Sequence, residues 1–140
     1  MKAENIILHH SLTADSQTVS WGAIRRYHVH KLGWNGIGYH FGIELVDDHF
    51  EVIMGRMMNA DGAHCKQQGM NRKSWGICLV GNFDLVRPED SQLMVAKNLI
   101  RALMEVGGIP KENVFPHRHF ASYKSCPGGL FPFEEFINSI

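Results

Sequence analysis

Cysteine is scarce in this sequence, and none of its three cysteines belongs to a Cys-x-x-Cys pair. Cys65, Cys78 and Cys126 cannot all form disulfides within the chain, because their number is odd. A disulfide framework and a zinc ribbon both need cysteines paired at characteristic spacings, so neither is indicated. We expect the thiols to be reduced, with Cys65 and Cys78 free.

Long apolar runs are also missing. The N-terminal segment has only three consecutive apolar residues, Ile6–Leu8, before two histidines, which is too short for the apolar region of a secretory signal. Elsewhere no stretch approaches the ~20 apolar residues that a membrane-spanning helix needs. The sequence therefore predicts no membrane insertion and a protein that is cytoplasmic as synthesised.

The chain also has no excess of positive or negative charge. Lysine plus arginine and aspartate plus glutamate number 14 each, and neither sign forms a run. This pattern gives no reason to expect binding to nucleic acid or to an anionic membrane.

The chain has 140 residues without repeats or low-complexity linkers, which is the length of one ordinary domain. We expect residues 1–140 to form a single domain and the protein to be a monomer.

The apolar pattern predicts strands and helices that alternate along the chain. The expected strands are Ile6–Leu8, Tyr39–Leu45, Phe50–Met54, Ser74–Val80 and Val114–Phe115. The second and third of these form a hairpin that turns at Asp47–Asp48. The expected helices are Trp21 to about Lys31, with Ser20 as N-cap, then about 90–107 and Phe133–Ile140. Such an alternation is typical of an α/β fold with a central mixed sheet flanked by helices.

Histidine is unusually frequent, with nine in the chain, and imidazole is the commonest metal ligand. Two histidines follow the first apolar run, and because adjacent strand residues point to opposite faces, at most one of them serves a given metal. The segment HRHFASYKSCPGG, residues 117–129, adds two histidines and a cysteine. A hydrolytic zinc takes three ligands of these types and keeps one position open. The candidate ligands are His9, His10, His117, His119 and Cys126.

Spacing alone leaves an ordinary structural interpretation open. His9 would then be a hydrogen-bonded core histidine and Cys126 a small buried hydrophobe, while His117 and His119 would lie on the surface. Two histidines and a cysteine spread over more than a hundred residues form no local metal-binding signature.

Five sequence blocks occur in the same order as in a known family. These blocks are IILHHS, GWNGIGYHFGI, GAHC, SWGICLVGNFD and PHRHFASYKSCPG. In them the chain resembles the zinc-dependent N-acetylmuramoyl-L-alanine amidases, which include phage lysozyme-type amidases and peptidoglycan-recognition proteins. The resemblance implies that family's fold, zinc as cofactor and peptidoglycan or a muropeptide as substrate. It implies His9, His117 and Cys126 as the zinc ligands.

One interval departs from the family pattern. Cys126 follows His117 by nine residues, one more than is usual in the family. Either the loop accommodates an extra residue, or His119 takes the ligand role. We favour His117, because Arg118 follows it as the family's His-Arg pattern requires.

The resemblance also implies roles for side chains that do not bind the metal. Tyr39 would orient or deprotonate the attacking water, and Lys124 would stabilise the oxyanion that develops in the tetrahedral intermediate. His64 of GAHC resembles a residue near the family's substrate groove and is a candidate substrate contact. Without the resemblance, Tyr39 would be interpreted as a core aromatic residue and Lys124 as a solvated loop charge.

The activity implied by the resemblance is hydrolysis of the amide bond between N-acetylmuramic acid and L-alanine in peptidoglycan. A non-catalytic peptidoglycan-binding module is the alternative, because some relatives lack a zinc ligand and bind without cutting. A hydrolase with Cys126 as nucleophile is a third interpretation. A phage-type enzyme of this kind would be released to the cell wall through a holin, whereas a recycling enzyme would act in the cytoplasm.

Overall fold

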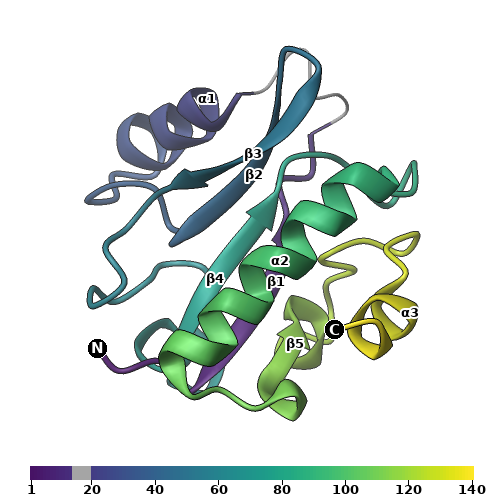
Figure 1. Ribbon diagram of the computed structural model, residues 1–140. Helices are drawn as coiled ribbons and strands as arrows, with labels where there is room; N and C mark the ends of the chain where they lie inside the picture. Colours follow the sequence, from purple (N-terminus) through teal and green to yellow (C-terminus); the bar gives the residue numbers. More distant parts are fainter. Residues whose placement is uncertain (14–19) are drawn as a thin grey trace.

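The computed structural model describes residues 1–13 and 20–140, and a five-stranded sheet forms its centre (Figure 1). The strands are β1 (Asn5–His10), β2 (Phe41–Val46), β3 (His49–Met54), β4 (Ser74–Leu79) and β5 (Val114–Pro116). Their order across the sheet is β3-β2-β4-β1-β5. β1 runs parallel to β4 and β5, β2 runs parallel to β4, and β2 and β3 form an antiparallel hairpin. The mixed sheet confirms the α/β class expected from the sequence.

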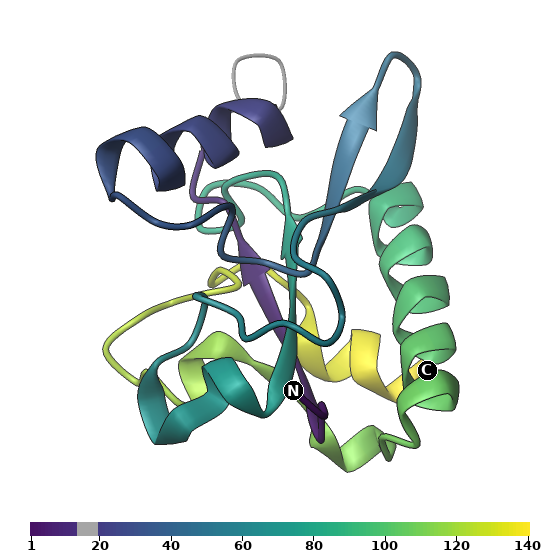
Figure 2. The ribbon, with the colours of Figure 1, turned by 90° about the vertical axis from the view of Figure 1, so that its left-hand side faces the viewer.

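Helices cover both faces of this sheet. Figure 2 shows α1 (Trp21–Arg26) on one side and α2 (Asp90–Gly107) on the other. The other helical segments are short. In chain order these are η1 (Tyr27–Lys31), η2 (Gln67–Arg72), η3 (Lys111–Asn113), η4 (His117–His119) and α3 (Phe133–Asn138). Within the two described ranges, no helix combines the length and the apolar character needed to cross a membrane.

The alternation of side chains along β1 separates two packed layers. Ile6 and Leu8 point into the main core, where they share a cluster with Ile100 of α2. Ile7 lies on the opposite face in a smaller apolar cluster. Because side chains on a strand alternate with a period of two, His9 shares the face of Ile7. The strand thus directs Leu8 into the core and His9 away from α2.

β1 is longer than its apolar run suggested. It continues through His9 and His10, which pair with Cys78 and Leu79 of β4. The strand does not end where its apolar residues end, because main-chain pairing does not depend on the polarity of the side chain. This extension places His9 within the sheet rather than on a loop.

The first helix begins as expected and then changes type. Ser20 caps it, since its Oγ accepts a hydrogen bond from the Ala23 amide at 3.2 Å. After Arg26 the chain continues as the π-helix η1. Its wider turn is seen in the bond from the Leu32 amide to the Tyr27 carbonyl, five residues earlier.

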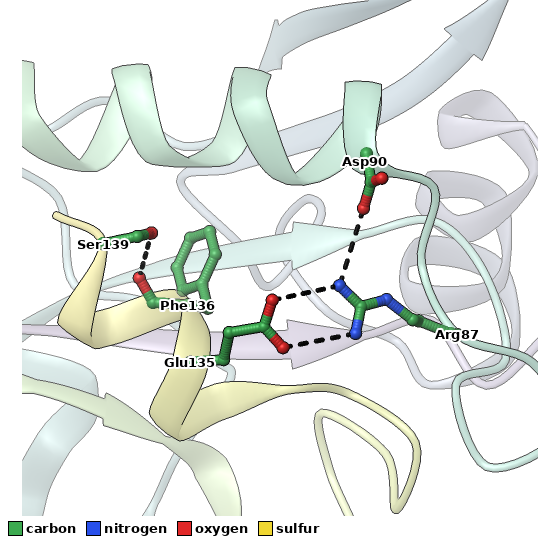
Figure 3. A network of polar contacts seen from close by, with 5 residues as sticks. All are labelled: Arg87, Asp90, Glu135, Phe136 and Ser139. Atoms are coloured by element: carbon green, nitrogen blue, oxygen red, sulfur yellow. Dashed lines mark hydrogen bonds and ion pairs between the residues drawn. The ribbon is translucent and has the colours of Figure 1, made fainter.

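The C-terminal helix α3 packs in the same layer as α2. Phe133 and Phe136 of α3 are buried in the main core. At the surface between the two helices, the Arg87 guanidinium lies 3.4 Å from a carboxylate oxygen of Glu135 and 3.5 Å from one of Asp90 (Figure 3). These ion pairs are exposed and contribute little. Burial of the two phenylalanines therefore dominates the docking of α3.

We expect the packing of α2 to respond unequally to two matched substitutions. Ile100 is fully buried, whereas Met94 on the same helix is 62% exposed. Ile100→Ala should lower the free energy of unfolding by about 2–5 kcal/mol, because it removes buried methyl groups and leaves a cavity. Met94→Ala should change it by less than about 0.5 kcal/mol. Urea unfolding followed by circular dichroism measures both, and equal stability of the two variants would contradict this packing.

Candidate metal centre

A cavity of about 520 Å³ opens beside the carboxyl end of β1. Its wall includes His9 from β1, Tyr39 from the segment before β2 and His64 from the loop before η2. Residues at both ends of the segment from His117 to Cys126 supply another part of the wall. These parts of the chain are far apart in sequence, and the sheet brings them together.

The side chains of His9, His117 and Cys126 meet in this wall. One nitrogen or sulfur atom from each lies within 4.8 Å of the corresponding atoms of the other two, and all three residues are buried. Nδ1 of His9 is 3.7 Å from Sγ of Cys126, and the ring centroids of His9 and His117 are 4.4 Å apart. We call these three residues the His-His-Cys cluster. They are the residues that the resemblance implied as metal ligands.

The register of β1 and β5 sets the separation of the two histidines. The strands run parallel, with Leu8 paired with Pro116. His9 and His117 each follow one residue later, so they leave the paired region at the same level. Neighbouring strands lie about 4.8 Å apart, which brings the two imidazoles into contact.

Arg118 and Asp84, for which the sequence predicted no contact with the loop, hold the segment that carries Cys126. The Arg118 amide donates to the Cys126 carbonyl at 2.8 Å, and its guanidinium donates to the carbonyls of Ser125 and Gly128 at 3.2 and 3.1 Å. Asp84 accepts a hydrogen bond from Ser125 Oγ at 2.7 Å. The available signals were the arginine that follows His117 and the acidic residue that ends SWGICLVGNFD. The Arg118 side chain thus fixes the main chain next to the cluster, and Asp84 holds the Ser125 side chain beside it.

The donor atoms and their spacing fit a zinc ion. Tetrahedral zinc, with bonds of about 2.0 Å to nitrogen and about 2.3 Å to sulfur, separates the two donors by about 3.5 Å. The separation of His9 Nδ1 from Cys126 Sγ is 3.7 Å. Two imidazoles and one thiolate also form a three-ligand set, the number that hydrolytic zinc sites use while keeping one position for water.

Burial controls the protonation of the cluster. It lowers the pKa of His9 well below the usual 6.5, with smaller contributions from the neighbouring histidines and Lys124. Burial and then the charge of Lys124 lower the pKa of His117 to about 4, whereas burial raises the pKa of Cys126 to about 11. At neutral pH both imidazoles therefore offer a lone pair, and Cys126 is a thiol whose proton a bound cation would displace.

Tyr39 and Lys124 lie in the wall of the same cavity. The ring centroid of Tyr39 is 5.2 Å from that of His9. Burial is the main cause that raises the pKa of Tyr39 well above 10, so its hydroxyl keeps its proton at neutral pH. Lys124 is exposed, and its charge helps to lower the pKa of His117.

His119 lies outside the His-His-Cys cluster. It is exposed, and its ring stacks on Phe115 with centroids 4.6 Å apart and an interplanar angle of 26°. The nine-residue interval from His117 to Cys126 is accommodated by the one-turn helix η4 and the turns that follow it. The structure thus brings His117, rather than His119, to Cys126.

His64 contacts the cluster from the side of η2. Its Nδ1 is 2.9 Å from Nε2 of His9, and its Nε2 is 3.4 Å from the carbonyl oxygen of Ser74. Burial lowers the pKa of His64 to about 3, so this ring is also neutral. His64 thus forms a hydrogen bond with His9, another residue of the site. Contact between His64 and a substrate stays a prediction.

Comparisons with known proteins point to one family. A family model described as N-acetylmuramoyl-L-alanine amidase matches residues 1–129. The chain is 35% identical to peptidoglycan-recognition protein LB of Drosophila melanogaster over 135 residues, covering 91% of this chain and 55% of that protein. It is 33% identical to the endolysin of Enterobacteria phage T3 over 126 residues, covering 89% of this chain and 80% of that protein. The chain thus spans about half the length of the insect relative and most of the phage relative.

Solved structures share the fold. N-acetylmuramoyl-L-alanine amidase LysC from Clostridium intestinale URNW superposes with a TM-score of 0.84 at 30% identity, covering 99% of this chain and 85% of that chain. A mutant of Drosophila peptidoglycan-recognition protein LB in complex with tracheal cytotoxin superposes with a TM-score of 0.77 at 32% identity, covering 94% and 79%. Because the family model spans nearly the whole sequence and these structures share its fold, the chain belongs to the N-acetylmuramoyl-L-alanine amidase family.

Proposed function

We propose that the protein is a zinc-dependent N-acetylmuramoyl-L-alanine amidase that hydrolyses the amide bond between N-acetylmuramic acid and L-alanine in peptidoglycan. The observation that carries this proposal is the convergence of His9, His117 and Cys126 in the wall of an open cavity. Family membership supports the substrate class. Similarity to a phage endolysin supports a role in cell-wall lysis, in which the protein would reach the wall through a holin.

The His-His-Cys cluster supplies one nitrogen atom from each of two neutral imidazoles and the sulfur atom of one ionisable thiol. A zinc ion held by these residues would supply a Lewis acid that activates water and polarises an amide carbonyl. The imidazoles of His9 and His117 are ready to donate their lone pairs, because burial keeps their pKa values far below neutrality. Cys126 would contribute the negative charge of its thiolate. No protein nucleophile is then required.

We infer that Tyr39 orients the attacking water. Its ring lies against that of His9, at the edge of the cluster. Since burial raises the pKa of the hydroxyl, the group stays protonated at neutral pH and acts as a hydrogen-bonding partner. This supports orientation of the water over its deprotonation, the two roles that the resemblance implied.

Lys124 brings positive charge to the exposed side of the same cavity. Attack on the amide carbonyl places negative charge on its oxygen, and a cation held nearby stabilises that charge. Because Lys124 is exposed, its ammonium can approach a substrate that enters from solvent. This supports the oxyanion-stabilising role.

Cys126 is poorly placed to act as a nucleophile. The thiolate is the reactive form of cysteine, and reactive cysteines are partly exposed with lowered pKa values. Cys126 is only 9% exposed, and burial raises its pKa to about 11. These properties support a ligand role for Cys126 over covalent catalysis.

Removal of the metal, or of its thiolate ligand, should abolish cleavage. On purified peptidoglycan, cleavage is measured as new α-amino groups of L-alanine on the stem peptides. Chelation should remove zinc and activity together, and added zinc should restore both. Cys126→Ala should lower activity by about 10³-fold or more, because metal activation supplies several kcal/mol of transition-state stabilisation.

Cys65→Ala is the matched control for this prediction. Cys65 is also a buried free thiol, but it lies outside the cluster, so the variant should keep its zinc and its activity. Full activity of Cys126→Ala without bound zinc would overturn the proposal. Binding of peptidoglycan without cleavage, by wild-type protein loaded with zinc, would instead identify a non-catalytic binding module.

Tyr39→Phe tests the orienting hydroxyl while the aromatic ring is retained. We expect kcat to fall by about 10²-fold, because a positioned proton-transfer or water-orienting group typically contributes at least this much. Zinc content and KM should stay near their wild-type values, since the ring and the cluster are unchanged. Steady-state kinetics on a soluble muropeptide measures both parameters, and an unchanged kcat would exclude the role.

Lys124→Met tests the positive charge while the apolar stem is retained. We expect kcat to fall by about 10²–10³-fold, as for the loss of one group that stabilises an oxyanion. Lys97→Met is the control, because Lys97 lies on α2, on the opposite side of the sheet. Equal kinetics of the two variants would show that the charge of Lys124 does not act in the reaction.

A further inference from the structure

His64 and His9 form a hydrogen bond between two imidazoles beside the cluster. The distance between Nδ1 of His64 and Nε2 of His9 is 2.9 Å, and the ring planes are 86° apart. Two neutral imidazoles bond in this way only when one nitrogen carries the proton and the other the lone pair. The contact therefore couples the tautomers of the two rings.

The Ser74 carbonyl determines which ring donates. Nε2 of His64 faces this oxygen at 3.4 Å, and because a carbonyl oxygen only accepts, Nε2 carries the single proton of His64. Nδ1 of His64 must then accept, so His9 donates from Nε2. The lone pair of His9 is consequently on Nδ1, the atom that faces Sγ of Cys126.

The position of His64 is fixed by its surroundings. A Cβ added at either Gly62 or Gly76 would lie 2.5 Å from atoms of the His64 ring, so the ring fits only because both neighbours are glycines. Asn71 Oδ1 accepts hydrogen bonds from the amides of His64 and Cys65, both at 2.8 Å. Side chain and main chain are thus both held in place before any ligand arrives.

The same contacts leave no ring nitrogen of His64 for a substrate. Nδ1 is used by His9 and Nε2 by the Ser74 carbonyl. Although His64 lines the cavity, it therefore presents mainly ring carbon atoms to a bound molecule. A role through His9 accounts for its nitrogen contacts better than hydrogen bonding to the substrate does.

We propose that His64 is a positioning residue, which holds His9 in the tautomer and ring orientation that direct Nδ1 toward the metal. The inference rests on the proposed zinc site. A metal-binding histidine generally donates its second ring N–H to a carboxylate, a carbonyl or water, and loss of such a partner typically costs about 10–100-fold in metal affinity. Here a third histidine takes that place.

The test compares His64→Leu with His64→Asn. Both side chains branch at Cγ with a similar shape, but only asparagine offers an acceptor, Oδ1, near the position of Nδ1. Zinc affinity is measured by competition with a chromophoric chelator. We expect His64→Leu to weaken zinc binding by about 10–100-fold, and His64→Asn to recover most of this loss. His119→Leu removes an exposed histidine outside the cluster and should bind zinc as tightly as the wild type.

A second measurement reads the tautomer directly and needs no metal. Long-range ¹H–¹⁵N NMR spectra distinguish protonated from unprotonated imidazole nitrogens. In metal-free wild-type protein we expect His9 to carry its proton on Nε2 and none on Nδ1. In His64→Leu we expect a mixture of both tautomers, with circular dichroism confirming that the variant is folded.

The outcomes separate this inference from the proposed function. If the wild type binds zinc and His64→Leu binds it equally tightly, or if His64→Asn is as weak as His64→Leu, the positioning role is wrong while the zinc site stands. A proton on Nδ1 of His9 in the metal-free wild type would overturn the inference alone. A wild-type protein that binds no zinc would overturn both.

Discussion

The parallel pairing of β1 with β5 is the constraint on which the site depends. Leu8 is paired with Pro116, and this register brings close together two histidines that lie more than a hundred residues apart in sequence. A slip of one residue would turn one of the two side chains to the opposite face of the sheet. Ile6 and Leu8 oppose such a slip, because it would remove them from the main core. The residues that stabilise the fold therefore also set the spacing of His9 and His117.

Elements with strong local patterns could be predicted from the sequence. The helical spacing of Leu93, Ala96 and Ile100 predicted α2, and alternating apolar residues predicted the β2–β3 hairpin, both of which the structure contains. The full length of β1 could not be predicted, because the pairing of His9 with Cys78 leaves no trace in side-chain polarity. The π-helical turn after Arg26 likewise has no pattern of its own in the sequence.

The candidate site could be predicted only in part, because its contacts are non-local. Spacing left His117 and His119 as equal candidates, and the resemblance favoured His117. The structure adds a physical reason, since β5 ends level with β1 just before His117, whereas His119 stacks on Phe115. The bond between His64 and His9 joins a loop residue to a residue of β1, and no periodicity or motif spacing could have indicated it.

Burial of the His-His-Cys cluster costs desolvation free energy, and folding alone does not require it. Two buried imidazoles and a buried thiol fill a position that apolar side chains would fill without desolvating polar groups. A module that only binds peptidoglycan would need the exposed wall of the cavity, including Lys124, and would gain nothing from these three side chains. Binding of a cation would satisfy their lone pairs and replace the thiol proton. The burial of His9, His117 and Cys126 around one point is therefore the arrangement on which the proposed zinc site rests.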